Sequence, residues 1–215
     1  MLRSALVALA VTLFSPGVFA QAFQEGVHYQ RIQPAQPTDD PKQVEVVEVF
    51  GYLCPHCANF QPFIDSWVTE APEHVEYRRI PVVFRPSWEP LARAYYAIEA
   101  LGIVDEAHEA IFTALHKERM RLVSNEDIAE FIAERYDISE SDYLRAANSF
   151  AIETKLRRGM SQVQRFGVNA TPSIVINGKY RATAAMAGSN AKLIELIEHL
   201  VAQEYAAIAE TASSN

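Results

Sequence analysis

Residues 44–57 read VEVVEVFGYLCPHC and contain the only two cysteines of the chain. The first seven residues are β-branched or aromatic at every position except the two glutamates, which predicts a strand. The residues that follow, 58–68, place apolar side chains at helical spacing. Cys54 and Cys57 therefore lie where a strand leads into the N-terminus of a helix.

This placement favours a reactive thiolate on Cys54. The first turn of a helix leaves backbone N–H groups unpaired and carries partial positive charge, so it stabilises a thiolate over a thiol. Pro55 suits the first helical position because its missing N–H has no partner there. His56 adds a donor or a positive charge near the same sulfur. We expect Cys57, one turn further into the helix, to be the more buried of the two.

Three other functions for the pair are less favoured. A structural disulfide between residues three apart closes a very small loop, and stabilisation grows with loop length. A zinc site normally needs four ligands, and no second Cys-x-x-Cys is present. Haem attachment needs a histidine directly after the second cysteine, where this chain has Ala58. Redox catalysis is the favoured interpretation.

The N-terminal 20 residues have the pattern of a secretory signal peptide. Arg3 precedes an apolar run, and Val18-Phe19-Ala20 offers small residues for cleavage. We therefore expect export, with cleavage after Ala20. The formal net charge of the 215-residue chain is -8, which argues against nucleic-acid binding.

The rest of the chain predicts an α/β fold interrupted by helices. A polar arm at 21–42 contains one short edge strand, and a second full strand follows the cysteine helix at 75–84. Five helical segments occupy 87–166. Two strands joined by Asn177-Gly178, which favours a hairpin turn, then lead into a final helix.

The helical segments contain no chemical motif. We interpret their histidines and tyrosines as core or surface residues of a bundle rather than as catalytic groups. These residues are His108, His116, Tyr95, Tyr96, Tyr136 and Tyr143.

This arrangement resembles the thioredoxin superfamily and, within it, the DsbA family of periplasmic disulfide oxidases. The resemblance rests on FGYLCPHC at 50–57, ATP at 170–172 and VINGKY at 175–180. It implies a thioredoxin-like fold with an inserted all-helical domain. The expected boundaries are a signal peptide at 1–20, a thioredoxin-like domain at 21–84 and 160–208, a helical domain at 85–159, and a disordered tail at 209–215.

The resemblance also implies roles for residues outside the cysteine pair. Pro172 matches a cis proline that faces the cysteines, beside backbone that binds an extended substrate. Thr171 stands where the best-known member has valine, at a position that helps to set the redox properties.

Glu48 matches a buried acid that relays protons to and from Cys57, and Arg79 matches its basic partner. The alternation of the strand supports this role, because Glu48 shares parity with Val46 and Phe50, which should face the interior.

The expected function is that of a thiol:disulfide oxidase that donates a Cys54–Cys57 disulfide to reduced, newly exported proteins. The resemblance implies a monomer without a cofactor, reoxidised by a quinone-linked membrane partner of the DsbB type. The alternatives are a reductase or isomerase of the same fold, or a non-catalytic metal chaperone or holdase. A dimeric isomerase is less favoured because residues 21–43 are too few for a dimerisation domain, and a reductase more typically has Gly-Pro between its cysteines.

Overall fold

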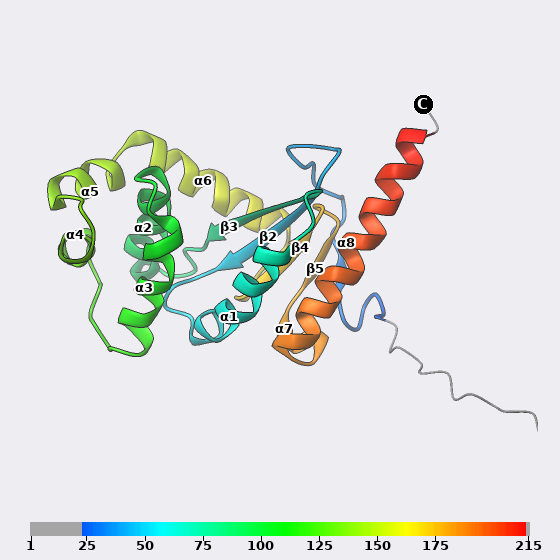
Figure 1. Cartoon of the computed structure of the whole chain (residues 1–215), viewed down its shortest axis with the longest axis horizontal. Coiled ribbons are helices and arrows are strands. Elements are labelled where there is room, and N and C mark those ends of the chain that lie inside the picture. Colours follow the sequence, from blue (N-terminus) through cyan, green and yellow to red (C-terminus); the bar gives the residue numbers. More distant parts are fainter. Residues whose placement is uncertain (1–22, 214–215) are drawn as a thin grey trace, which may run out of the picture.

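The computed structural model describes residues 23–213, and the signal peptide predicted at 1–20 lies outside them. The centre is a five-stranded sheet in the order β1-β5-β4-β2-β3 (Figure 1). Strands β2 and β3 are parallel, and the other neighbours are antiparallel. The strands are β1 (Gln30–Arg31), β2 (Val44–Phe50), β3 (Val75–Pro81), β4 (Ser173–Ile176) and β5 (Tyr180–Ala182).

Helices cover both faces of the sheet. Helices α1 (Pro55–Glu70) and α8 (Asn190–Ser213) pack on one face, with the short α7 (Ala184–Ala187) beside them. Helix α6 (Phe150–Arg165) packs on the other face, against β3. Strand β2 is buried at all seven positions because it lies inside the sheet between these layers. The predicted α/β class and thioredoxin-like arrangement are confirmed.

A group of helices lies beyond one end of the sheet (Figure 1). It contains a 3₁₀ turn (Pro86–Trp88), α2 (Glu89–Ala100), α3 (Val104–His116), α4 (Asn125–Arg135) and α5 (Glu140–Ala147). Its apolar core is continuous with Phe50, Tyr52, Cys54 and Cys57. The inserted helices therefore pack directly on the strand end and helix start that hold the cysteines.

Two expected boundaries differ from the helices of the structure. The boundary expected between 159 and 160 falls inside the single helix α6. The disordered tail expected at 209–215 is wrong for residues 209–213, because α8 continues to Ser213. No proline or glycine interrupts this Ala-rich stretch, so nothing ends the helix earlier.

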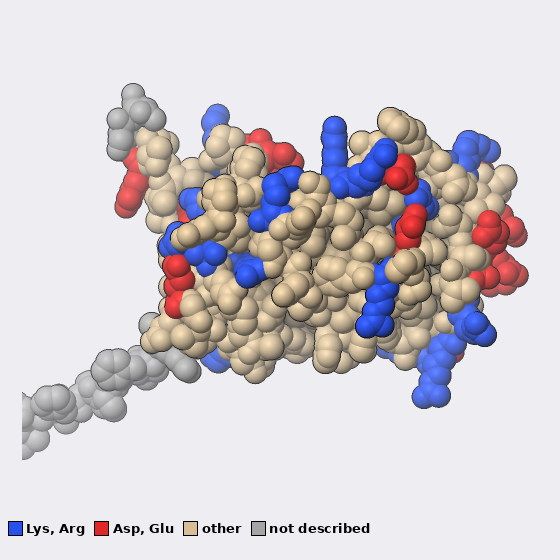
Figure 2. All heavy atoms as spheres, turned by 180° about the vertical axis from the view of Figure 1, so that it is seen from behind, with Lys and Arg blue, Asp and Glu red and all other residues tan. Residues whose placement is uncertain are grey.

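Charged side chains are interspersed on the face of the molecule shown in Figure 2. Basic and acidic side chains alternate there with neutral surface, although the chain as a whole carries a formal charge of -8. This face is therefore not a continuous field of one sign.

The loop between β2 and Cys54 is predicted to depend on a glycine. A Cβ added to Gly51 would overlap the indole ring of Trp88. We expect Gly51→Ala to lower the free energy of unfolding by about 1–3 kcal/mol, because one of the two groups must move. Equilibrium urea unfolding of the reduced protein measures this change. The double variant Gly51→Ala with Trp88→Leu should lose less stability than the two single variants added together. A loss in the double variant equal to that sum would contradict the overlap.

Candidate active site

Both cysteines lie at the start of α1, where β2 ends. Cys54 is the N-cap residue of the helix, and Cys57 is in its first turn. Cys54 is 8% exposed and Cys57 is fully buried, and both are free thiols. Pro55 and His56 are exposed between them. Cys57 is therefore the more buried of the two, as the sequence predicted, but Cys54 is also largely buried rather than exposed.

The environment of Cys54 favours its thiolate. Its pKa is lowered to about 5, chiefly because the Cys57 side chain donates a hydrogen bond to the sulfur. The Thr171 side chain and the backbone N–H groups of His56 and Cys57 lower the pKa further, while partial burial opposes them. His56 therefore lowers the Cys54 pKa through its backbone N–H group, whereas the sequence pointed to its imidazole ring.

The environment of Cys57 has the opposite effect. Burial raises the pKa of the Cys57 thiol well above its ordinary value, and its hydrogen bond and charge interaction with Cys54 raise it further. The negative charge of Glu48 adds to this effect. Cys57 therefore holds its proton while Cys54 releases one.

The loop before β4 completes the surroundings of Cys54. The Cys54 Sγ lies 3.3 Å from the carbonyl oxygen of Thr171. The Thr171–Pro172 peptide bond is cis, as the resemblance implied. The structure thus brings the predicted Thr171 and Pro172 to the cysteine pair from the opposite end of the chain.

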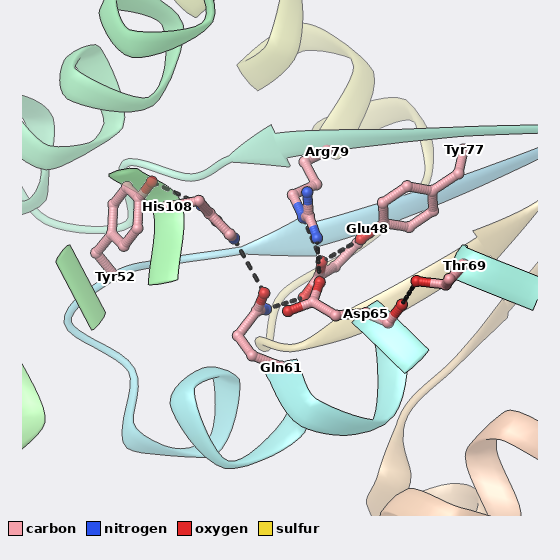
Figure 3. A network of polar contacts seen from close by, with 8 residues as sticks. All are labelled: Glu48, Tyr52, Gln61, Asp65, Thr69, Tyr77, Arg79 and His108. Carbon is pink, nitrogen blue, oxygen red and sulfur yellow. Dashed lines mark hydrogen bonds and ion pairs between the residues drawn. The ribbon is translucent and has the colours of Figure 1, made fainter. Parts of the chain in front are cut away.

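Glu48 is fully buried in β2, and hydrogen-bond donors surround its carboxylate (Figure 3). Gln61 Nε2 donates to Oε1 at 3.0 Å, and Tyr77 donates to Oε2 at 2.5 Å. Arg79 lies opposite Glu48 in the parallel register, and its Nε donates to Oε2 at 3.1 Å. The structure thus brings the predicted pair together, while the adjacent Arg78 binds Glu45 instead.

Burial raises the pKa of the Glu48 carboxyl above its ordinary value. The positive charge of Arg79 and the hydrogen bonds from Tyr77 and Arg79 oppose this rise. A buried carboxyl whose pKa is raised takes up and releases a proton more readily than one whose pKa is low, which suits it to acid–base exchange with a neighbouring thiol.

The polar partners on the other side of Glu48 were not predicted from the sequence. Gln61 Oε1 lies 3.0 Å from His108 Nε2, and His108 Nδ1 lies 2.7 Å from the Tyr52 hydroxyl. Gln61 was detectable, because it is four residues after Cys57 and so occupies the same buried helix face. No local pattern distinguishes His108 from an ordinary core histidine.

Comparisons with known proteins agree with this site. A family model described as thioredoxin matches residues 41–197. The thiol:disulfide interchange protein DsbA of Pseudomonas aeruginosa is 31% identical over 207 residues, which cover 96% of this chain and 97% of that protein. DsbA of Bordetella parapertussis is 32% identical, covering 94% and 95%. The crystal structure of Pseudomonas aeruginosa DsbA superposes with a TM-score of 0.82, covering 86% of this chain and 96% of that one.

The chain belongs to the DsbA family of thiol:disulfide interchange proteins. It is therefore a protein thiol:disulfide oxidoreductase, and the Cys54–Cys57 pair is its redox centre. Within residues 23–213, no group of three or more His, Cys, Asp or Glu side chains is placed to hold a metal ion.

In this DsbA-family chain we expect Cys54 to titrate with a pKa of about 5. Ultraviolet absorbance of the thiolate in the reduced protein, with Cys54→Ser as the control, measures this value. The reduced protein should gain stability relative to Cys54→Ser between the folded pKa and the ordinary thiol pKa of about 8.5. The gain is complete above the ordinary value and is lost as pH falls through the folded pKa, so a pH-independent difference would contradict it.

The Thr171 side chain should be part of what sets the Cys54 pKa. Thr171→Val removes the hydroxyl that lowers this pKa. We expect the ionisation constant of Cys54 to fall about tenfold to a hundredfold, the effect of losing one hydrogen bond to a charged group. Thiolate absorbance measures the change, and Thr171→Ser, which keeps a hydroxyl, is the matched control. Equal pKa values in the valine and serine variants would show that the hydroxyl does not contribute.

Proposed function

We propose that the protein is a dithiol oxidase that donates its Cys54–Cys57 disulfide to reduced, newly exported proteins. The observation that carries this proposal is the low pKa of Cys54 at the N-terminus of α1. Stabilising the Cys54 thiolate stabilises the reduced enzyme, which makes the oxidised enzyme a stronger electron acceptor. A reductase needs the disulfide form of the pair to be the more stable one.

The reaction proceeds by two thiol–disulfide exchanges. A substrate thiolate attacks the Cys54 sulfur, the Cys54–Cys57 bond breaks, and Cys57 leaves with the electron pair and takes up a proton. A second substrate thiolate then attacks the substrate sulfur of the mixed disulfide and releases Cys54 as a thiolate. The substrate leaves with a disulfide, and its two electrons remain on the enzyme.

The surrounding residues have separate roles in this proposal. Glu48 supplies and removes the proton of Cys57, and Arg79 holds the carboxylate in place. The full burial of Glu48 and its 3.1 Å contact with the partly buried Arg79 support this. Thr171 and Pro172 present backbone to an extended substrate beside Cys54, which the 3.3 Å contact with Thr171 supports.

The location and partners follow from the same family membership. The signal-peptide pattern at 1–20 supports export to the periplasm, where a disulfide donor is useful. Of the helices between residues 23 and 213, none has the length and apolar character needed to cross a bilayer. Reoxidation falls to a quinone-linked membrane oxidase of the DsbB type, and we propose that the enzyme acts as a monomer.

The redox equilibrium tests the direction of the reaction. Equilibration with glutathione buffers should give a potential more oxidising than that of thioredoxin, about −270 mV. When offered a disulfide such as oxidised glutathione, Cys57→Ser should accumulate a mixed disulfide on Cys54, because the thiol that would displace the partner is gone, and Cys54→Ser should form none. A potential at or below that of thioredoxin would make the protein a reductase.

A further inference from the structure

Four buried side chains form a continuous hydrogen-bonded chain from the inserted helices to the active-site acid (Figure 3). The chain runs from Tyr52 through His108 and Gln61 to Glu48. Each of these residues is less than 5% exposed. Because water does not reach the chain, every donor and acceptor in it must be satisfied by the neighbouring member.

The direction of donation along the chain is set from the Glu48 end when Glu48 is ionised. The Glu48 carboxylate only accepts, so Gln61 must present its amide N–H to Oε1 and its carbonyl to His108. His108 then needs its proton on Nε2, which leaves Nδ1 to accept from the Tyr52 hydroxyl. Burial and the nearby charge of Arg79 hold the pKa of His108 well below its ordinary value, so the ring stays neutral.

Glu48, Gln61 and His108 also satisfy one another when Glu48 carries a proton, with the Tyr52 oxygen as the final acceptor. Oε2 already accepts from Tyr77 and Arg79, so the added proton belongs on Oε1 and points at Gln61. Gln61 accepts it by turning its amide over, which presents its N–H to His108 Nε2. His108 then carries its proton on Nδ1 and donates to the Tyr52 oxygen. In passing between the two states the ring releases its Nε2 proton to solvent and takes up another on Nδ1, during local opening of the site. Every member can reverse because each has both a donor and an acceptor.

We propose that His108 is a positioning residue for the exchange reaction: by changing tautomer it orients Gln61 so that Oε1 of Glu48 has a hydrogen-bond partner in both protonation states of the carboxyl group. This inference rests on the proposed role of Glu48 as the proton relay of Cys57. A relay must spend part of each cycle in each state, and a buried carboxyl without a partner in one state would be trapped in the other.

Other groups also face Glu48 and contribute to its titration. The titratable and charged groups around it are Cys57 and Asp65 on α1, Tyr77 and Arg79 on β3, Tyr95 on α2 and His108 on α3. Of these groups, His108 is the one that Gln61 links to Glu48. Tyr77 and Arg79 contact the other carboxylate oxygen, Oε2, and Asp65 contacts Arg79.

A purely structural role for His108 makes a different prediction. Helix α3 also holds Tyr52 through His116, whose Nε2 lies 2.7 Å from the Tyr52 carbonyl oxygen. If the two histidines only anchor the loop before Cys54, the proton of His108 has no reason to move when Glu48 titrates. His116 therefore serves as the internal control, since it lies on the same helix and contacts the same residue.

The test is an NMR titration of the full reduced protein labelled with ¹³C and ¹⁵N. The carboxyl carbon of Glu48 reports its protonation, and the ring nitrogens of each histidine report its tautomer. We expect the His108 ring to stay neutral and to change from the Nε2–H to the Nδ1–H tautomer as Glu48 takes up its proton, with the same midpoint. We expect His116 to show no tautomer change at that midpoint.

Two variants test whether the His108 tautomer change is caused by the protonation of Glu48 and transmitted through Gln61. Glu48→Gln should abolish the tautomer change in His108, because no proton enters at that end. Gln61→Leu should leave Glu48 titrating while His108 no longer follows it. A His108 tautomer that is constant through the Glu48 titration, or that still follows it in Gln61→Leu, would overturn the proposal.

The exchange rate gives the functional consequence. His108→Leu should slow exchange about threefold to tenfold and alter its pH profile, the effect of one lost hydrogen bond. His108→Gln, whose amide also donates and accepts, should restore both. If His108→Leu does not fold, the comparison of Gln61→Leu with wild type decides the question. A pH profile unchanged by Glu48→Gln would instead mean that the relay role of Glu48 fails, independently of His108.

Discussion

The hydrogen bond between the Cys57 thiol and the Cys54 sulfur joins two groups in opposite electrostatic environments. Cys54 lies at the positive end of α1 and beside the Thr171 loop, while Cys57 is sealed beneath it. The bond strengthens the contrast, because a proton held by Cys57 stabilises the charge on Cys54. The proposed oxidising character depends on this unequal sharing of a proton.

Burying the Glu48 carboxylate near the cysteine pair costs free energy, which hydrogen bonds from the sheet and from α1 offset. A carboxylate beneath the pair is expensive to bury, and Glu48 is tolerated because β3 supplies Tyr77 and Arg79 while α1 supplies Gln61. The parallel register of β2 and β3 places Arg79 directly opposite Glu48. The topology of the sheet is therefore part of the acid–base chemistry.

The inserted helices contribute more than coverage of the cysteine helix. Their apolar core is continuous with Phe50 and Cys57, which keeps water away from the sheltered thiol. The same insertion brings two histidines of α3 to Tyr52, two residues before the reactive cysteine.

Much of this protein could be predicted from local sequence, because the decisive features are short-range. The alternation of residues 44–50, the spacing of Cys54 and Cys57, and the turn at Asn177-Gly178 each specify local backbone geometry. The α/β class and the unequal burial of the cysteines follow from such local features. Strand parity did not decide the burial of Glu48, because β2 is covered on both faces and Glu45, of the other parity, is buried as well.

Only the tertiary structure decided which distant side chains share the site. Tyr52, Gln61 and His108 come from the loop after β2, from α1 and from α3, and no spacing rule relates residues on separate elements. Helix periodicity identifies His108 as buried but cannot say what it faces. Hydrogen-bond partners across a core are set by how the elements pack, which is why the polar chain to Glu48 was visible only in the folded protein.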